Sequence, residues 1–308
     1  MRPVNKPHPA PYLEMLVTPL PTIRETVRTA LFDTIGRHCS FCEMPLKISE
    51  AIVSKKDGRM RRRPSLDDWS DLLVACDFCM DARTEKNVDL QNYIWPDTDA
   101  SFTLGAASPF LYVRRNVIIE RVDEHGEITS ESSPAVIVEV NPACTPVLRA
   151  RAQATIDLHG LNTRQYNPAT QTFTFTPDTA LIYDPRVSER TEAWDIATTS
   201  AINIQQSVNE DLPDAFIRAL EQLTTNLTQE VGFWSVWMTV FRNHFNDEDV
   251  LDRLLVRTTT RSGYSISGYQ SVPPESRPGG GTPGDQQGGY GPFLFFTGTA
   301  RERLGFAQ

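Results

Sequence analysis

The amino-acid sequence predicts an α+β protein that combines a cysteine-held core, a small β-hairpin and a mainly helical C-terminal region. Three observations lead to this prediction. Four cysteines form two C-x-x-C pairs, apolar residues alternate in two segments between residues 112 and 140, and they recur at helical spacing from Pro185 onward. The chain has 308 residues, of which 40% are hydrophobic and 22% are charged, so it can bury a core.

The two cysteine pairs are the strongest signal in the chain. Each pair places two thiolates on one turn, and 33 residues separate the pairs. In a reducing compartment such pairs bind metal more often than they form disulfides, and four thiolates satisfy the tetrahedral preference of zinc. The sequence therefore predicts a structural Zn²⁺ site. Its ligands are Cys39, Cys42, Cys76 and Cys79, and His38 is a ligand, a donor to the thiolates or a surface residue.

Helix and turn signals divide the first half of the chain. Residues 1–20 are proline-rich and are expected to form an extended arm, and a capping box at Thr22 begins a helix that Gly36 ends. A short helix is expected at residues 80–88. Two strands are expected at 112–122 and 135–140, with a turn at His125 and Gly126. A helix opening at Thr145 is expected to end at Gly160, and TFTFT (residues 172–176) reads as a strand.

The second half of the chain reads as mainly helical, followed by a tail. Helices are expected at 186–208, 212–229, 231–244 and 247–256, and FWSVWMTVF within them suits either a core helix or a partner-facing one. The predicted organisation is an arm at 1–20, a metal-bound region at 21–200, a helical region at 201–257 and a Gly/Pro-rich tail at 258–308. The tail carries the apolar cluster Phe293–Phe296, which is expected to dock on its own chain, on a protein partner or in a homo-oligomer.

Charge and hydropathy exclude several classes of protein. No apolar run approaches the length needed to span a bilayer, and the N-terminus lacks the order of a secretory signal, so a soluble cytoplasmic protein without membrane contact is expected. The net charge of −9 argues against a nucleic-acid binder held by bulk charge.

One segment departs from the acidic balance. KKDGRMRRR carries +5, which leaves −14 for the rest of the chain. Because arginine forks recognise phosphate well, this loop is a candidate site for nucleic acid or a nucleotide. A protein contact and a solvated loop are the alternatives. The candidate binding residues are Lys55, Lys56, Arg59, Arg61, Arg62 and Arg63.

The frame around the cysteines resembles HNH-type endonucleases, in particular a bacterial and phage branch with two C-x-x-C knuckles. The second knuckle, DDWSDLLVACDFC, carries the resemblance, and YIWPDTDASF and RAQATIDLHGLN are similar to later segments of that branch. The likeness covers roughly residues 30–200 and implies a ββα-metal core. It also implies a setting in bacterial or phage defence.

The resemblance implies an active site that this sequence does not reproduce. The family's general-base histidine corresponds here to Ser54 or Lys55, its orienting asparagine to Asp71, and its last metal ligand to Met80. A thioether is a poor ligand for Mg²⁺, and loss of a general base alone costs about two to four powers of ten in rate. The expectation is an inactive nuclease centre in a protein that binds nucleic acid or a partner.

Two alternatives stay open. The first is an active metal-dependent endonuclease in which a rearranged site, with rescue candidates Asp68, Asp71 and Lys55, holds Mg²⁺ or Mn²⁺. Asp67, Asp77 and Asp81 lie near it in sequence. The second is a structural protein-interaction module, in which the zinc and the basic loop only shape a surface.

Overall fold

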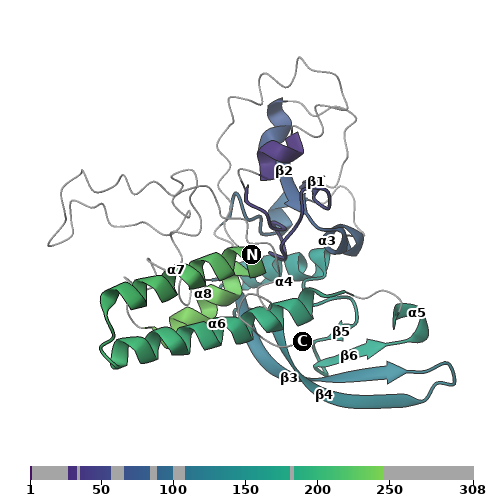
Figure 1. Ribbon diagram of the computed structural model, residues 1–308. Helices are drawn as coiled ribbons and strands as arrows, with labels where there is room; N and C mark the ends of the chain where they lie inside the picture. The colour runs from purple at the N-terminus through teal and green to yellow at the C-terminus, as the bar shows by residue number, and fades with distance from the viewer. Residues whose placement is uncertain are drawn as a thin grey trace.

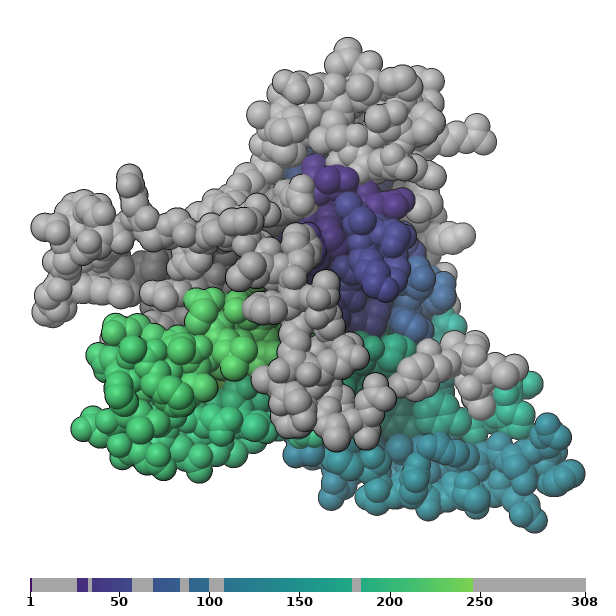
Figure 2. Space-filling model, viewed as in Figure 1, coloured from purple at the N-terminus to yellow at the C-terminus, as the bar shows by residue number. Residues whose placement is uncertain are grey.

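The computed structural model describes residue 1 and residues 27–32, 35–56, 66–83, 89–99, 108–180 and 184–245. A cysteine-bearing region, a three-helix layer and a long β-hairpin adjoin one another (Figure 1), and the helices and the hairpin extend in different directions from the cysteine-bearing region (Figure 2). The predicted arm, the predicted helix at 247–256 and the tail with Phe293–Phe296 lie outside the described residues, apart from residue 1.

The cysteine-bearing region contains two short strands and a helix. Strand β1 (Ile52–Lys55) pairs antiparallel with β2 (Leu72–Ala75), which follows the 3-10 helix η1 (Leu66–Asp71). Helix α3 (Asp77–Ala82) comes next, so the predicted start at Met80 is wrong. The helix begins earlier because the Cys76 side chain accepts the backbone N–H of Cys79 and thereby caps it. The chain order after the first cysteine pair is therefore strand, strand, helix.

The predicted hairpin is confirmed and is longer than the sequence indicated. Strands β3 (Phe110–Val122) and β4 (Ile128–Val140) pair antiparallel along their whole length, and Gly126 turns between them at a φ of 82°. The extra length lies in the first half of β4, where the exposed polar residues give no apolar alternation. Strand β6 (Thr172–Phe175) adds parallel to β3 and pairs with β5 (Tyr166–Asn167), which gives the order β4-β3-β6-β5.

The helices follow the predicted spacing closely. Helix α4 (Pro146–His159) is capped by Thr145 and ends at Gly160, whose φ is 52°. Helices α6 (Arg186–Asn209), α7 (Asp214–Val231) and α8 (Trp234–His244) form the helical layer, and η2 (Leu90–Asn92) and α5 (Pro177–Ala180) are short elements. Residues 27–32 and 35, within the helix predicted between Thr22 and Gly36, are also helical. Helix α6 runs through residue 200, where the sequence placed the end of its metal-bound region.

One apolar cluster joins the cysteine-bearing region to the helices. It includes Leu73, Ile94, Trp237 and Phe241, all fully buried, so the aromatic face of α8 is core. A smaller cluster of Val117, Ala135, Ile137, Phe173 and Val187 packs the sheet against the start of α6. None of the helices in the described part of the chain combines the length and the apolar character that crossing a bilayer requires.

Candidate metal centre

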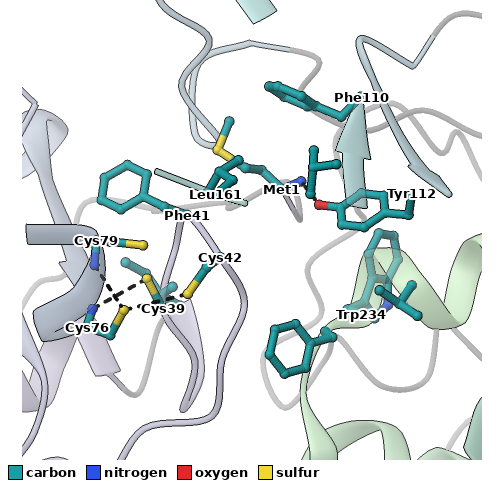
Figure 3. Packing of buried hydrophobic residues seen from close by; sticks show 14 of the residues in the cluster. Met1, Cys39, Phe41, Cys42, Cys76, Cys79, Phe110, Tyr112, Leu161 and Trp234 are labelled. Atoms are coloured by element: carbon teal, nitrogen blue, oxygen red, sulfur yellow. Dashed lines mark hydrogen bonds between the residues drawn. The ribbon is translucent and has the colours of Figure 1, made fainter. Parts of the chain in front are cut away.

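The four predicted cysteines meet in one buried cluster. Their ligand atoms all lie within 4.8 Å of one another, and no side chain is more than 4% exposed. Figure 3 shows the sulfurs of both pairs facing a common point. Four thiolates converging from two tight turns form a closed set, so the cluster is compatible with a structural metal such as zinc. The ligand atoms belong to Cys39, Cys42, Cys76 and Cys79.

Backbone bonds lock the two cysteine turns together. The Cys39 N–H donates to the Met44 carbonyl at 2.9 Å, which closes the first turn. The Cys76 N–H in turn donates to the Cys39 sulfur at 3.4 Å, and the Ser40 N–H donates to the Val74 carbonyl of β2 at 2.8 Å. Because N–H donors to sulfur favour the thiolate, these contacts orient the cluster and stabilise its charge.

A buried arginine from α6 neutralises part of the cluster's charge. The Arg186 Nη1–H donates to the Cys79 sulfur at 3.3 Å and to the His159 carbonyl at 2.8 Å. Asp184 holds the same guanidinium at 2.6 Å. Burial opposes the charged form, but the Cys79 sulfur and Asp184 outweigh it and raise the pKa of Arg186 above its ordinary value. Four thiolates exceed the charge of one divalent ion by two, so a fixed cation at this point favours the loaded centre.

His159, the last residue of α4, is a buried histidine in an apolar environment. Its ring stacks on Phe41 at a centroid distance of 3.8 Å and lies edge-on to Trp95. Burial, reinforced by the charge of Arg83, lowers the pKa of His159 to about 3. The neutral ring therefore packs beside the first cysteine turn and carries no charge near neutral pH.

The residues that flank the first cysteine pair bind the C-terminal helices. His38 lies outside the ligand cluster, and its Nε2–H donates to the Gln229 carbonyl of α7 at 2.9 Å. Glu43 is buried, and its carboxylate accepts from the Ser235 N–H and hydroxyl at 2.7 and 2.6 Å. Its backbone carbonyl accepts the Phe233 N–H at 3.0 Å. The turn that carries the first cysteine pair therefore caps the start of α8, although Glu43 and Ser235 lie 192 positions apart in the sequence.

The described part of the basic segment is buried. Lys56 Nζ lies 2.9 Å from Asp97 Oδ1, with side chains 4% and 3% exposed. Lys55 is 9% exposed, and the Arg83 guanidinium donates to the backbone carbonyls of both lysines. These two lysines therefore anchor the end of β1, and their contact with nucleic acid stays a prediction. Arg59, Arg61, Arg62 and Arg63 lie outside the described residues.

The positions that the predicted resemblance would place in an HNH active site make structural contacts. Ser54 is buried and its hydroxyl donates to the Lys55 carbonyl at 3.2 Å, while Met80 packs against the apolar core. The Asp71 carbonyl accepts the Lys56 N–H at 3.0 Å. Within the ranges that the structure describes, the four cysteines are the one group of acidic, histidine or cysteine ligands that could hold an ion. The side chain of Asp68 lies outside them, so the rearranged magnesium site stays a prediction.

Sequence reasoning found the ligands but missed their surroundings. Arg186 and Glu43 carry no motif, and the motif that contains Asp97 gives no indication of its partner. Each of the three finds its partner more than 40 residues away in the chain, at Cys79, Ser235 and Lys56. No family model, curated protein or solved structure matches this chain. The fold and the site thus define a mixed α and β protein with a buried four-cysteine centre.

The metal-free centre is expected to bind zinc more tightly as the pH rises. Burial raises the pKa of the Cys42 thiol, and bonding to Cys39 raises that of Cys76. Burial opposes the Cys39 thiolate, but hydrogen bonds from the other three thiols lower its pKa. Zinc must therefore displace at least two protons near neutral pH, so its affinity should rise at least about 100-fold per pH unit. Chelator competition at about pH 6 and about pH 8 checks this, and a pH-independent affinity would show that the thiolates preexist.

Proposed function

We propose that this chain is a zinc protein with an HNH-like knuckle and an inactive nuclease centre, and that it works as a binding component. Zinc fixes the two cysteine turns, and the basic segment that leaves β1 after Lys56 supplies the contact with the phosphates of a nucleic acid. The resemblance of the knuckle to a bacterial and phage branch of the family suggests a role in defence, which is an analogy.

The closed cysteine cluster is the observation that carries this proposal. All four ligand positions are occupied by buried sulfurs, so a metal there has no open position for substrate or water. Ser54 and Met80 supply neither a general base nor a ligand for a hard cation at the positions where the family has them. What the arrangement supports is a rigid base for the loop between β1 and β2.

The binding proposal predicts salt-sensitive association without cleavage. Zinc-loaded full chain is incubated with supercoiled plasmid or single-stranded DNA, with and without Mn²⁺, over a salt series. We expect no nicking, and binding whose logarithm falls linearly with the logarithm of salt, because phosphate contacts release counterions. Reversal of Arg61, Arg62 and Arg63 to glutamate should remove most of this binding.

A charge-matched control separates the loop from bulk charge. Arg121, Arg149 and Arg218 are exposed and distant from that loop in sequence, and their reversal to glutamate gives the same net charge. Equal loss of binding in both variants would contradict a specific role of the loop. Nicking that requires Mn²⁺ and disappears in Asp71→Ala would instead support the active endonuclease, and no binding in any salt would support a purely structural module.

A further inference from the structure

Helix α7 carries an apolar stripe that is only partly covered. Phe216, Leu220, Leu223 and Leu227 follow one another at spacings of four, three and four residues, so they share one face of the helix. Leu227 is 6% exposed, whereas Leu223 is 43% and Phe216 49% exposed. The same face is therefore core at the C-terminal end of α7 and solvent-exposed at its N-terminal end.

The exposure follows from the unequal lengths of the helices. Helix α8 has 11 residues, against 24 in α6 and 18 in α7. At 1.5 Å per residue α8 spans about 16 Å and α7 about 27 Å, so the α6–α7 turn projects past α8, as Figure 1 shows. On α6, Ile202 and Val208 are 41% and 50% exposed toward the same end. We call the surface formed by Ile202 and Val208 of α6 and by Phe216 and Leu223 of α7 the overhang.

We propose that residues 247–256, DEDVLDRLLV, cover the overhang as a fourth, amphipathic helix of this layer. These residues lie outside the described ranges, and the proposal is independent of the proposed function. Val250, Leu251, Leu254 and Leu255 recur at helical spacing and would form one apolar face. A helix this short is marginal alone, so its leucines require a surface of this kind.

The exit point of the chain favours this occupant over the tail. Phe245 ends α8 as a buried residue, and its N–H donates to the Phe241 carbonyl at 2.7 Å, so the chain leaves from within the helical layer. Helix α8 follows α7 after a short connection and packs antiparallel to it, so the C-terminal end of α8 points toward the overhang and a segment that continues in that direction reaches the exposed stripe of α7. About 5 residues separate Phe245 from Val250, whereas about 48 separate it from Phe293. The lower entropy cost of closing the shorter loop favours the nearer segment roughly 30-fold.

Photo-crosslinking of the full, metal-loaded chain tests the proposal. A benzophenone amino acid replaces Leu223, or Phe216 in a second preparation, and the crosslinked peptides are identified by mass spectrometry. We expect the main product to join α7 to the peptide containing 247–256 within one chain. The same probe at Val147 of α4, which is 72% exposed, should not give that product.

Two matched double variants locate the contact face. Leu251→Asp with Leu254→Asp should abolish the product, whereas Asp249→Asn with Asp252→Asn, on the opposite face of the predicted helix, should keep it. Circular dichroism confirms that both variants retain their helices. A main product with Phe293–Phe296, a product between isotopically light and heavy copies, or no product from either probe position would each overturn the proposal.

Discussion

Replacing Cys76 by serine is expected to abolish zinc binding at the proposed centre and to unfold the region around it. Serine retains an oxygen that can cap α3, so the substitution removes a soft ligand while keeping the local helix start. Structural zinc contributes about 10 kcal/mol or more in small zinc domains, which is comparable with the whole stability of a typical domain. The zinc content should fall from one per chain to a small fraction, as measured by elemental analysis.

The effect should extend to the C-terminal helices. Glu43 and His38 lie on either side of the first cysteine pair and bind Ser235 and Gln229. Unfolding of the turn that carries this pair therefore breaks both contacts. Amide exchange should accelerate in β1, β2 and α3 and also at the start of α8. Cys144→Ser is the matched control, because Cys144 lies outside the cluster and is only half buried. Full zinc content and unchanged exchange in Cys76→Ser would refute the proposed ligand set.

Replacing Glu43 by alanine is expected to lower the free energy of unfolding by about 3 kcal/mol or more, because it breaks a buried charged network. The carboxylate is 3% exposed and accepts from Ser235, from the Tyr112 hydroxyl at 3.4 Å and from the Met1 ammonium at 3.2 Å. Figure 3 shows the Met1 nitrogen beside Tyr112. Without Glu43 the buried donors of Ser235 and Tyr112 lose their acceptor, and α8 loses its cap. Urea unfolding of the zinc-loaded chain measures the loss.

Glu50→Ala provides the comparison for Glu43→Ala. Glu50 is 51% exposed and pairs with Lys47, which is 82% exposed, so its removal should change the stability by less than about 1 kcal/mol. Glu43→Gln should fall between the two, because it retains the shape and one acceptor oxygen but loses the charge. Equal stability of Glu43→Ala and Glu50→Ala would contradict the capping role of Glu43.

Local sequence signals predicted the elements well where the signal and the contact lie close together. Thr145 and Gly160 delimit α4 as expected, and Gly126 turns the hairpin with a positive φ. The start of α3 was predicted three residues late, because its cap is a cysteine sulfur and not one of the usual oxygen acceptors. The first half of β4 was missed because its pairing uses the backbone, while its side chains face solvent.

The basic segment shows where reading charge from sequence falls short. A run of cations is typical of a solvated loop, yet Lys56 is buried against Asp97, and the Lys55 carbonyl accepts a hydrogen bond from the buried Arg83 guanidinium. Asp97 follows 41 positions later in an acidic stretch with no periodic signal. The sequence could not pair them, because an isolated buried charge is costly and only the folded chain shows which opposite charge compensates it.

The sequence by itself determined the helices, the hairpin and the four sulfur ligands, because caps, periodicity and C-x-x-C spacing act within a few residues of chain. Only the tertiary structure decided what surrounds the centre: Arg186 on Cys79, His159 neutral against Phe41, and Glu43 at the start of α8. Burial and charge compensation depend on groups that come together from distant segments. They give the cysteine centre its links to the helical layer, which spacing alone does not encode.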